Sequence, residues 1–385
     1  MTRPSAALFL GASAMFANMY STQAILPDVE RGLGASPAAA GLTITVVVLA
    51  VAAGGWVAGP LSDRLGRARV MSSAAVLICI PTAVAGLAPT MPALLAVRAC
   101  QGLLMPGLLT VAVPYVTERF RGSAAGAAMG AYTASLVFGG LVGRVGTALV
   151  ADVTSWRVGL EALTLPTVAG ALAMYAWLPR DEPRHQRRDL RAVAAEHVRN
   201  ASLLLNALAA GATFFAFVGV FTFATHRLTA PPLGLSLGAA GLVYAVWVVG
   251  AVVPLVGHAA ARIGPERLLP FLLACAGVGA ALTLVDNLAA VIAGLALLAA
   301  SMFSTVTTCQ LLIPRLVDHH RGTATSLHQT VYYVLGGAGA YIPGLWLDDG
   351  WHAVVVACCV AVAIGAVASL GLAIRRSGTL AGDVR

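Results

Sequence analysis

Long apolar runs, separated mostly by short polar joints, limit how this chain can fold more than any other feature. A helix needs about 20 mainly apolar residues to cross the hydrocarbon layer of a bilayer. The chain contains twelve such runs, at approximately residues 6–27, 38–60, 70–88, 91–116, 122–150, 157–178, 201–225, 237–261, 267–285, 288–314, 322–346 and 352–374. The first run continues through Ile25 and Leu26 without a small-residue cleavage pattern, so we interpret it as a span and not as a signal peptide.

The composition supports the same fold class. The chain has 385 residues, of which 59% are hydrophobic and 10% are charged, whereas soluble domains carry roughly 25% charged residues. A soluble protein of this size cannot bury so much apolar surface. The 41 glycines suit close packing between membrane helices. We therefore predict an all-α membrane protein with twelve spans.

The arginines predict the orientation of these spans. All 24 cationic side chains are arginine. With both termini in the cytoplasm, 19 of the 24 arginines fall in cytoplasmic segments, as the positive-inside rule requires. We expect a multi-pass protein of the bacterial inner membrane, in contact with the lipid bilayer. Since the net charge of +8 is explained by topology, we expect no nucleic-acid partner.

The chain also repeats itself at an offset of about 195 to 200 residues. The matching elements are Arg64 and Gly66 with Arg262 and Gly264, Arg121–Gly122 with Arg321–Gly322, and Gly139–Gly140 with Gly336–Gly337. This spacing predicts two pseudo-symmetric six-helix bundles, at residues 1–179 and 201–385, joined by a polar cytoplasmic linker at 180–200 whose second part is amphipathic. Duplicated transporters of this kind bind substrate between their halves, near the middle of the membrane.

Two motifs carry a resemblance to a known family. The stretch "GPLSDRLGRARV" (residues 59–70) resembles the signature between helices 2 and 3 of the major facilitator superfamily. The stretch "LLAVRACQGLLMPGL" resembles the R-x-x-Q-G signature of the drug:proton antiporter branch, with Arg98, Gln101 and Gly102 in place. The likeness covers all twelve spans and implies a secondary transporter that works by alternating access.

One stretch departs from the antiporter pattern. Antiporters of this branch often carry a G-x-x-x-G-P-x-x-G-G signature in helix 5, and the corresponding residues here read "GGLVGRVGTAL". Gly139 and Gly143 fit the signature, but Arg144 occupies the place of the proline. We leave two roles open for Arg144: a structural pair with Asp152 or Glu161, or contact with a substrate.

Ionisable residues inside spans are expensive and mark functional sites by default. Here they are Arg98, Arg144, Glu161, His258 and His328. Glu161 is the only carboxylate inside a predicted span, which makes it a candidate proton carrier. His328 is its rival because histidine titrates near neutrality, and Asp63 is a third candidate for proton coupling. The alternative for Glu161 and His328 is a satisfied polar residue at a helix contact.

The resemblance places the transport cavity on helices 1, 4, 7 and 10 together with 2, 5, 8 and 11. An apolar pocket with a few polar anchors suits small amphiphilic molecules. The candidate substrate-binding residues on these helices are Tyr20, Gln23, Arg98, Gln101, Tyr132, Arg144, Phe215, Tyr244, Gln310, His328, Gln329 and Tyr332.

The first motif predicts a gating device. Its candidate residues are Gly59, Asp63, Arg64, Gly66, Arg67 and, at the end of helix 4, Glu118. We expect Asp63 to lie beside the positive N-terminus of the following helix, and Glu118 to pair with Arg67 or Arg64. The second copy of the motif has Ala261 in place of the acid and offers Glu266 as a displaced one.

No enzyme motif is present in the sequence. The chain lacks a G-x-x-x-x-G-K-[ST] loop, so we expect an ion gradient to supply the energy, and no metal or cofactor. We predict a monomeric secondary transporter that exports small organic molecules in exchange for protons. The alternative is uptake or exchange of a small organic anion, which Arg98 and Arg144 favour. A sensor without transport activity would be expected to carry a sizeable extra domain.

Overall fold

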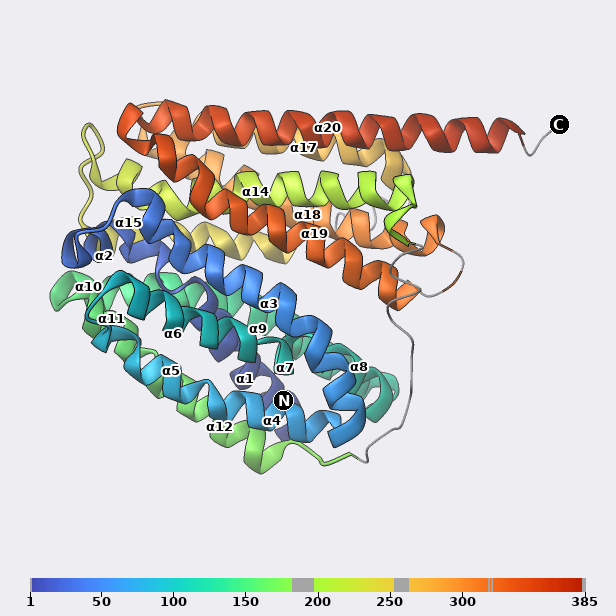
Figure 1. Ribbon diagram of the computed structural model, residues 1–385, viewed down its shortest axis with the longest axis horizontal. Coiled ribbons are helices and arrows are strands. Elements are labelled where there is room, and N and C mark those ends of the chain that lie inside the picture. The colour runs from blue at the N-terminus through green and yellow to red at the C-terminus, as the bar shows by residue number, and fades with distance from the viewer. Residues whose placement is uncertain (1, 182–196, 253–262, 318, 320, 383–385) are drawn as a thin grey trace. The chain divides into compact units, whose positions relative to one another are not determined.

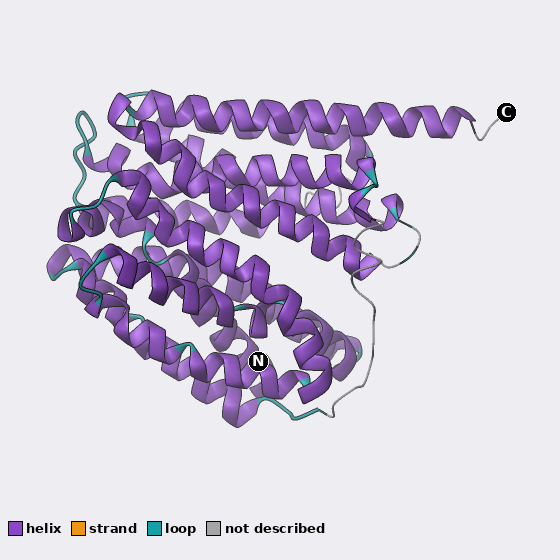
Figure 2. Ribbon diagram, viewed as in Figure 1, coloured by secondary structure: helices purple, strands orange, loops and turns teal. Residues whose placement is uncertain are grey.

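The computed structural model describes residues 2–181, 197–252, 263–317, 319 and 321–382. Within these ranges the chain is helical and contains no strand (Figures 1 and 2). Most of the predicted linker lies outside the described residues. His258, Ala261 and Arg262 also lie outside the described residues.

The helices before the linker break repeatedly at glycine and proline. They are α1 (Arg3–Tyr20), η1 (Gln23–Ile25), α2 (Leu26–Leu33), α3 (Pro37–Leu65), α4 (Arg67–Leu77), α5 (Cys79–Val84), η2 (Ala85–Leu87), α6 (Met91–Leu104), α7 (Pro106–Leu109), α8 (Ala112–Arg119), α9 (Gly122–Leu141), η3 (Val142–Gly146), α10 (Thr147–Val153), α11 (Trp156–Ala162) and α12 (Thr164–Trp177).

The helices after the linker are fewer and longer. They are α14 (Ala201–Thr229), α15 (Leu237–Val243), η4 (Tyr244–Val252), α17 (Pro265–Leu282), α18 (Leu288–Leu316), α19 (Arg321–Tyr341), η5 (Ile342–Asp349) and α20 (Trp351–Gly382). Several helices of both groups begin at a polar cap. The side chains of Ser36, Thr90 and Ser155 accept hydrogen bonds from the first free backbone N–H groups of α3, α6 and α11.

Nine helices of the described residues are long and apolar enough to cross a membrane. They match nine of the twelve predicted runs. The other three runs correspond to α1, to the shorter apolar helix Leu237–Gly250, whose continuation lies outside the described residues, and to the more polar α19. The all-α membrane fold is therefore confirmed, while the count of twelve spans remains a prediction.

The packing divides the chain into two compact units. The first comprises the described parts of Met1–Arg187 together with Thr222–Val248, and the second comprises those of Arg188–Phe221 and Val249–Arg385. This division differs from the predicted bundles in one respect: the last turns of α14 and all of α15 group with the first unit. The end of α14 bonds η1, where Gln23 donates to Thr222 and Thr225 donates to the carbonyl of Ala24, and α15 packs against α10.

Both units use glycine to bring helices into close contact. A Cβ atom at Gly139 or Gly143 would overlap the main chain of α1 at Ser13 or Ala17. In the second unit, a Cβ at Gly339 of α19 would overlap the main chain of α14 at Phe215. Small residues let membrane helices approach in this way, and the second unit repeats the arrangement of the first.

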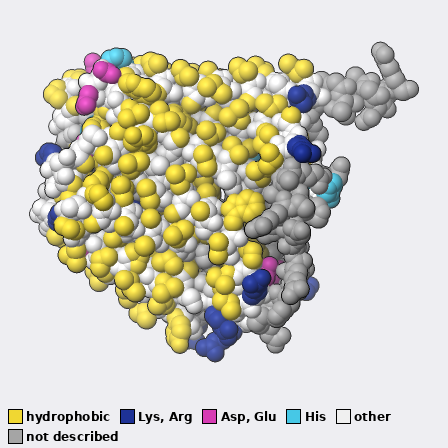
Figure 3. Space-filling view, viewed as in Figure 1, with side chains coloured by type: hydrophobic (Ala, Val, Ile, Leu, Met, Phe, Trp, Pro, Cys, Tyr) yellow, Lys and Arg dark blue, Asp and Glu magenta, His cyan; other side chains and the backbone are white. Residues whose placement is uncertain are grey.

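Large apolar side chains cover much of the described surface. Leu165 is 78% exposed, and Ile374 is 72% exposed. Figure 3 shows hydrophobic side chains over most of the face in view, with the charged side chains gathered near its edges. Exposed apolar area of this extent marks a membrane-facing surface.

Candidate functional site

A buried arginine lies at the centre of the first unit. Arg144 belongs to η3, a single π-helical turn between α9 and α10, and its side chain is inaccessible to solvent. Such turns often occur at functional sites. The guanidinium carbon lies 4.1 Å from the ring centroids of both Tyr20 and Trp247, and these rings contact each other, so the cation lies over two adjoining aromatic rings.

The hydrogen bonds of Arg144 leave part of the group unused. Its Nε donates to Oε1 of Gln23 at 2.7 Å, and its Nη1 donates to the carbonyl of Gly140 at 3.0 Å. Its Nη2 is buried and has no acceptor among the described residues. The contacts of Arg144 within that part of the chain include no carboxylate, so a full positive charge is buried with incomplete compensation.

The predicted structural pair for Arg144 is absent from the described residues. Asp152 instead accepts a hydrogen bond from Ser236 at 3.5 Å. Glu161 lies on α11 beside Gly86, where its carboxylate would contact a Cβ atom. Of the two roles left open by the sequence, the pair with Asp152 or Glu161 is therefore wrong.

Gln23 connects Arg144 to the end of α14. Its Nε2 donates to Oγ1 of Thr222 at 3.1 Å. Close by, Oγ1 of Thr225 donates to the carbonyl of Ala24 at 3.2 Å and lies 2.9 Å from the hydroxyl of Tyr244. We call the seven residues of this group the Arg144 cluster: Tyr20, Gln23, Arg144, Thr222, Thr225, Tyr244 and Trp247.

Arg98 is equally buried but has a different environment. Its Nε donates to the carbonyl of Thr43 at 3.1 Å, and its Nη2 donates to the carbonyl of Met19 at 2.8 Å. Its Nη1 has three acceptors: the carbonyl of Asn18, Oγ of Ser21, and Oε1 of Gln101 at 2.7 Å. These contacts join α6 to α1 and α3. We call them the Arg98 network.

Gln101 extends the Arg98 network. Its Nε2 donates to Oδ1 of Asn18 at 3.1 Å and to Oγ1 of Thr82 at 3.2 Å. Thr82 in turn donates to Asn18 at 2.8 Å. The two polar residues of the R-x-x-Q-G motif therefore bond each other and three helices around them, which favours a positioning role over direct contact with substrate.

The first sequence motif, residues 59–70, spans the end of α3, the turn at Gly66 and the start of α4. Gly66 has a φ of +93°, a region that favours glycine, and separates α3 from α4. Arg67 lies 2.8 Å from Glu118 and 3.5 Å from Asp63. The predicted pairing of Glu118 with Arg67 is present in the structure. Arg64 and Gly59 lie on the last turns of α3.

A second acid, which was not predicted from the sequence, caps the start of α4. Both carboxylate oxygens of Asp181 accept hydrogen bonds at 2.8 Å, one from the backbone N–H of Arg67 and one from that of Ala68. Nearby, the hydroxyl of Tyr115 donates to the carbonyl of Pro179 at 2.8 Å. Asp63 lies on the last turn of α3 and contacts Arg67, the first residue of α4, but the carboxylate that caps α4 comes from the chain after α12.

Asp181→Ala should lower the stability of the protein by about 1 to 2 kcal/mol, because the first N–H groups of α4 lose their acceptor. Thermal unfolding in detergent measures the change. Asp63→Asn is the matched control, since the contact that the structure gives Asp63 is the long one with Arg67. If Asp63→Asn destabilises the protein as much as Asp181→Ala, the assignment of the cap is incorrect.

The second copy of this turn keeps its backbone and reverses its ion pair. Gly264 has a φ of +90°, close to that of Gly66. Here the acid is Glu266, in the first turn of α17, and its partner is Arg315 of α18 at 3.8 Å. In the first copy, the helix after the glycine carries the arginine and α8 carries the acid. In the second copy, the helix after the glycine carries the acid and α18 carries the arginine.

Most of the remaining predicted residues belong to the second unit. His328 is buried, and neither of its ring nitrogens has a hydrogen-bond partner among the described residues. Tyr332 stacks on Phe214 with 4.0 Å between the ring centroids. Phe215 is buried in α14, whereas Gln310 is exposed and Gln329 is half-buried. In the first unit, the hydroxyl of Tyr132 donates to the carbonyl of Leu109 at 2.8 Å.

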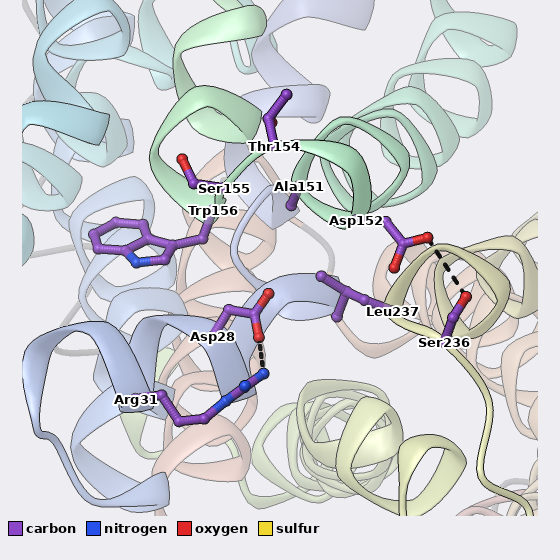
Figure 4. A pocket seen from close by; sticks show the side chains of 9 residues that line it. All are labelled: Asp28, Arg31, Ala151, Asp152, Thr154, Ser155, Trp156, Ser236 and Leu237. Atoms are coloured by element: carbon purple, nitrogen blue, oxygen red, sulfur yellow. Dashed lines mark hydrogen bonds and ion pairs between the residues drawn. The ribbon is translucent and has the colours of Figure 1, made fainter.

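An open polar pocket lies beside α2 in the first unit. Figure 4 shows Asp28 and Arg31 turned toward each other as an ion pair, and Asp152 turned toward Ser236. The pocket has a volume of about 470 Å³, and the indole of Trp156 forms part of its wall. It gives solvent access to the surface of α2.

Sequence reasoning missed several residues of these sites. Thr222, Thr225 and Trp247 have no motif, and only their contacts in the fold identify them. Asp181 lies within the predicted linker, and the sequence gives no signal that it caps a helix 114 residues away. Four members of the Arg144 cluster were among the predicted substrate-binding residues: Tyr20, Gln23, Arg144 and Tyr244.

Known proteins resemble this chain along its length. The family description of the Major Facilitator Superfamily matches residues 8–340, with a second match at 230–382. An uncharacterized MFS-type transporter of Bacillus subtilis, YybF, is 25% identical over 358 residues, which cover 91% of this chain and 88% of YybF. The inner membrane transport protein YnfM of Escherichia coli is 30% identical over 254 residues, covering 64% and 60%.

Solved structures share the fold. A bacterial homologue of the human lysosomal transporter Spinster, in an inward-facing and occupied conformation, matches with a TM-score of 0.77 and 17% identity over 96% of each chain. A mutant form of the nucleoside transporter NupG matches with a TM-score of 0.78 and 12% identity, over 96% of this chain and 99% of that one. The chain thus belongs to the Major Facilitator Superfamily and is a multi-pass membrane protein that transports small molecules by alternating access.

Proposed function

We propose that this transporter carries small organic molecules with an anionic group, and that Arg144 binds that group. The observation that supports this proposal is the buried, incompletely bonded guanidinium of Arg144, with Nη2 free and no carboxylate among its contacts in the described residues. A charge in this state is costly unless a partner completes it. An anionic substrate supplies that partner during part of the transport cycle.

The surroundings of Arg144 fit such a ligand. An arginine binds a carboxylate through two parallel N–H bonds, and Nε and Nη2 form one edge of the guanidinium. Nε currently donates to Gln23, a neutral acceptor that a carboxylate can displace. Tyr20 and Trp247 provide apolar faces beside the charge. The substrate class that follows is a small carboxylate with an apolar body.

Export of organic molecules in exchange for protons is the second candidate. The observation in its favour is the intact R-x-x-Q-G motif, in which Arg98 and Gln101 bond each other at 2.7 Å. Glu161 and His328 are its candidate proton carriers. A cationic drug would meet the unpaired charge of Arg144 if it entered the same site, so the charge of the ligand separates the two candidates. For both, we propose a bacterial inner-membrane protein with cytoplasmic termini.

Matched ligands test the proposal. The purified transporter is heated with panels of carboxylates, amines and alcohols built on the same carbon skeletons, such as benzoate, benzylamine and benzyl alcohol. We expect stabilisation by carboxylates alone. Stabilisation by amines without carboxylates would favour drug export and overturn the proposal, as would the absence of any stabilising carboxylate at millimolar concentration.

A further inference from the structure

Two titratable side chains meet at the end of α14, apart from the Arg144 cluster. Nε2 of His226 lies 2.9 Å from Oε2 of Glu30 on α2. The two side chains are 18% and 13% exposed, and their remaining polar atoms, Nδ1 of His226 and Oε1 of Glu30, are buried without a hydrogen-bond partner in the described part of the chain. A pair with so few other contacts depends strongly on its own protonation state.

From this geometry we infer that Glu30 and His226 form the proton-binding site that couples substrate movement to pH. The inference rests on the proposed function, because it assigns the proton to the same carrier. It differs from the sequence-based candidates Glu161 and His328. Both residues of the pair lie just beyond the ends of predicted spans, which is why a search limited to spans did not find them.

The chemistry of the pair gives the direction of the effect. Histidine changes charge near neutrality. With a proton on His226, the contact is an ion pair between oppositely charged groups, and it holds the end of α14 on α2. Without that proton, the contact is a hydrogen bond from a neutral imidazole N–H to the carboxylate, which lacks the attraction between two full charges. Mildly acidic pH, at which histidine is protonated and carboxylates are still ionised, therefore strengthens the docking of α14 on α2. Higher pH weakens it.

The charged neighbours of the pair are few. On α2, Asp28 and Arg31 form an ion pair with each other. On α14, Arg227 follows His226 and is buried. Across the open pocket of Figure 4 lies Asp152, and the first turns of α3, Pro37–Val47, contain no titratable side chain. Since Asp28 and Arg31 line this pocket, protons reach α2 from solvent.

A short chain of contacts links the pair to Arg144. His226 follows Thr225, which donates to the carbonyl of Ala24, and lies one turn after Thr222. Thr222 accepts from Gln23, and Gln23 accepts from Arg144. When the end of α14 loosens from α2, these bonds loosen with it. Proton release at the pair therefore frees the guanidinium of Arg144 for a substrate.

Hydrogen–deuterium exchange in lipid nanodiscs, without any substrate, tests the pair directly. The readout is the protection of peptides covering 222–229, at about pH 5.5 and about pH 8, after correction for the intrinsic exchange rate. We expect protection in the wild type to fall about three- to fivefold at the higher pH, the upper part of the range expected for one charge pair. His226→Gln and Glu30→Gln should each reduce this change to less than about twofold.

Two controls keep the test decisive. His352→Gln removes an exposed histidine of α20 and should leave the pH response intact. The exchanged variant, Glu30→His with His226→Glu, should restore it. The inference is overturned if His226→Gln keeps the wild-type response, or if the exchanged variant folds and shows none.

A second measurement separates this inference from the proposed function. Stabilisation by a carboxylate such as benzoate is measured at both pH values. We expect it to be stronger at the higher pH in the wild type and independent of pH in His226→Gln. Equal stabilisation at both pH values in the wild type would remove the coupling role and leave the anion site standing, whereas no stabilisation at either pH would remove the anion site.

Discussion

Arg144→Gln should strongly weaken the binding of anionic ligands while leaving the protein as stable as the wild type or slightly more stable. Losing a charge-assisted, two-point contact weakens carboxylate binding about 10- to 100-fold. Stability should stay within about 1 kcal/mol of the wild type, because replacing a buried charge by a neutral side chain is often neutral or stabilising. The ligand-induced shift in melting temperature and the melting temperature itself measure the two effects.

Arg144→Lys is the informative comparison. Lysine keeps the charge but lacks the planar fork and binds as a point charge. It cannot reproduce the parallel bonds, so most of the affinity should be lost although the charge is kept. If Arg144→Lys binds carboxylates as well as the wild type, the fork geometry plays no part. If Arg144→Gln unfolds the protein, Arg144 is a structural residue and the site assignment fails.

The fold class was predictable because membrane spans leave a strong signal. Runs of about 20 apolar residues have few alternatives to a helix in a bilayer, and the two motif stretches added the family. Local turns were predictable for a related reason. Gly66 and Gly264 recur at a fixed offset, and both adopt the positive φ that the motif requires.

The sites were less predictable because their partners are distant in sequence. Arg144 was identified by its place in a motif, but the 121 residues between it and Gln23 hide the bond that orients it. Asp63 was placed beside the start of α4 by adjacency in sequence, but the carboxylate that caps this helix is that of Asp181. Glu30 and His226 are 196 residues apart. A single sequence does not record which of its charged residues converge.

The two units also divide differently from the sequence repeat. The repeat predicts a boundary in the linker, whereas packing groups Thr222–Val248 with the first half. The difference follows from side chains and not from the helical pattern, because Thr222 and Thr225 bond η1 while the earlier turns of α14 pack in the second unit. Two segments of the second sequence half therefore reach Arg144: η4 directly, through Trp247, and the end of α14 through Gln23.

Arg98→Ala should have the opposite outcome to Arg144→Gln: a large loss of stability. All three nitrogens of Arg98 are bonded, mostly to main-chain carbonyls of α1 and α3. Truncation leaves these buried acceptors without donors and also frees Gln101. Breaking a buried charged network in this way costs about 3 to 5 kcal/mol. Thermal unfolding in lipid nanodiscs measures the loss.

Arg157→Ala provides the scale for that loss. Arg157 also donates to two carbonyls, those of Gly86 and Ala88, at 2.7 Å each, but it is only partly buried. Its removal should cost less than half as much as removal of Arg98, because water can solvate the freed carbonyls. Comparable losses from both variants would mean that burial does not set the strength of the Arg98 network. A stable Arg98→Ala variant that fails to bind carboxylates would instead mean that Arg98, and not Arg144, is the buried arginine that binds the anion.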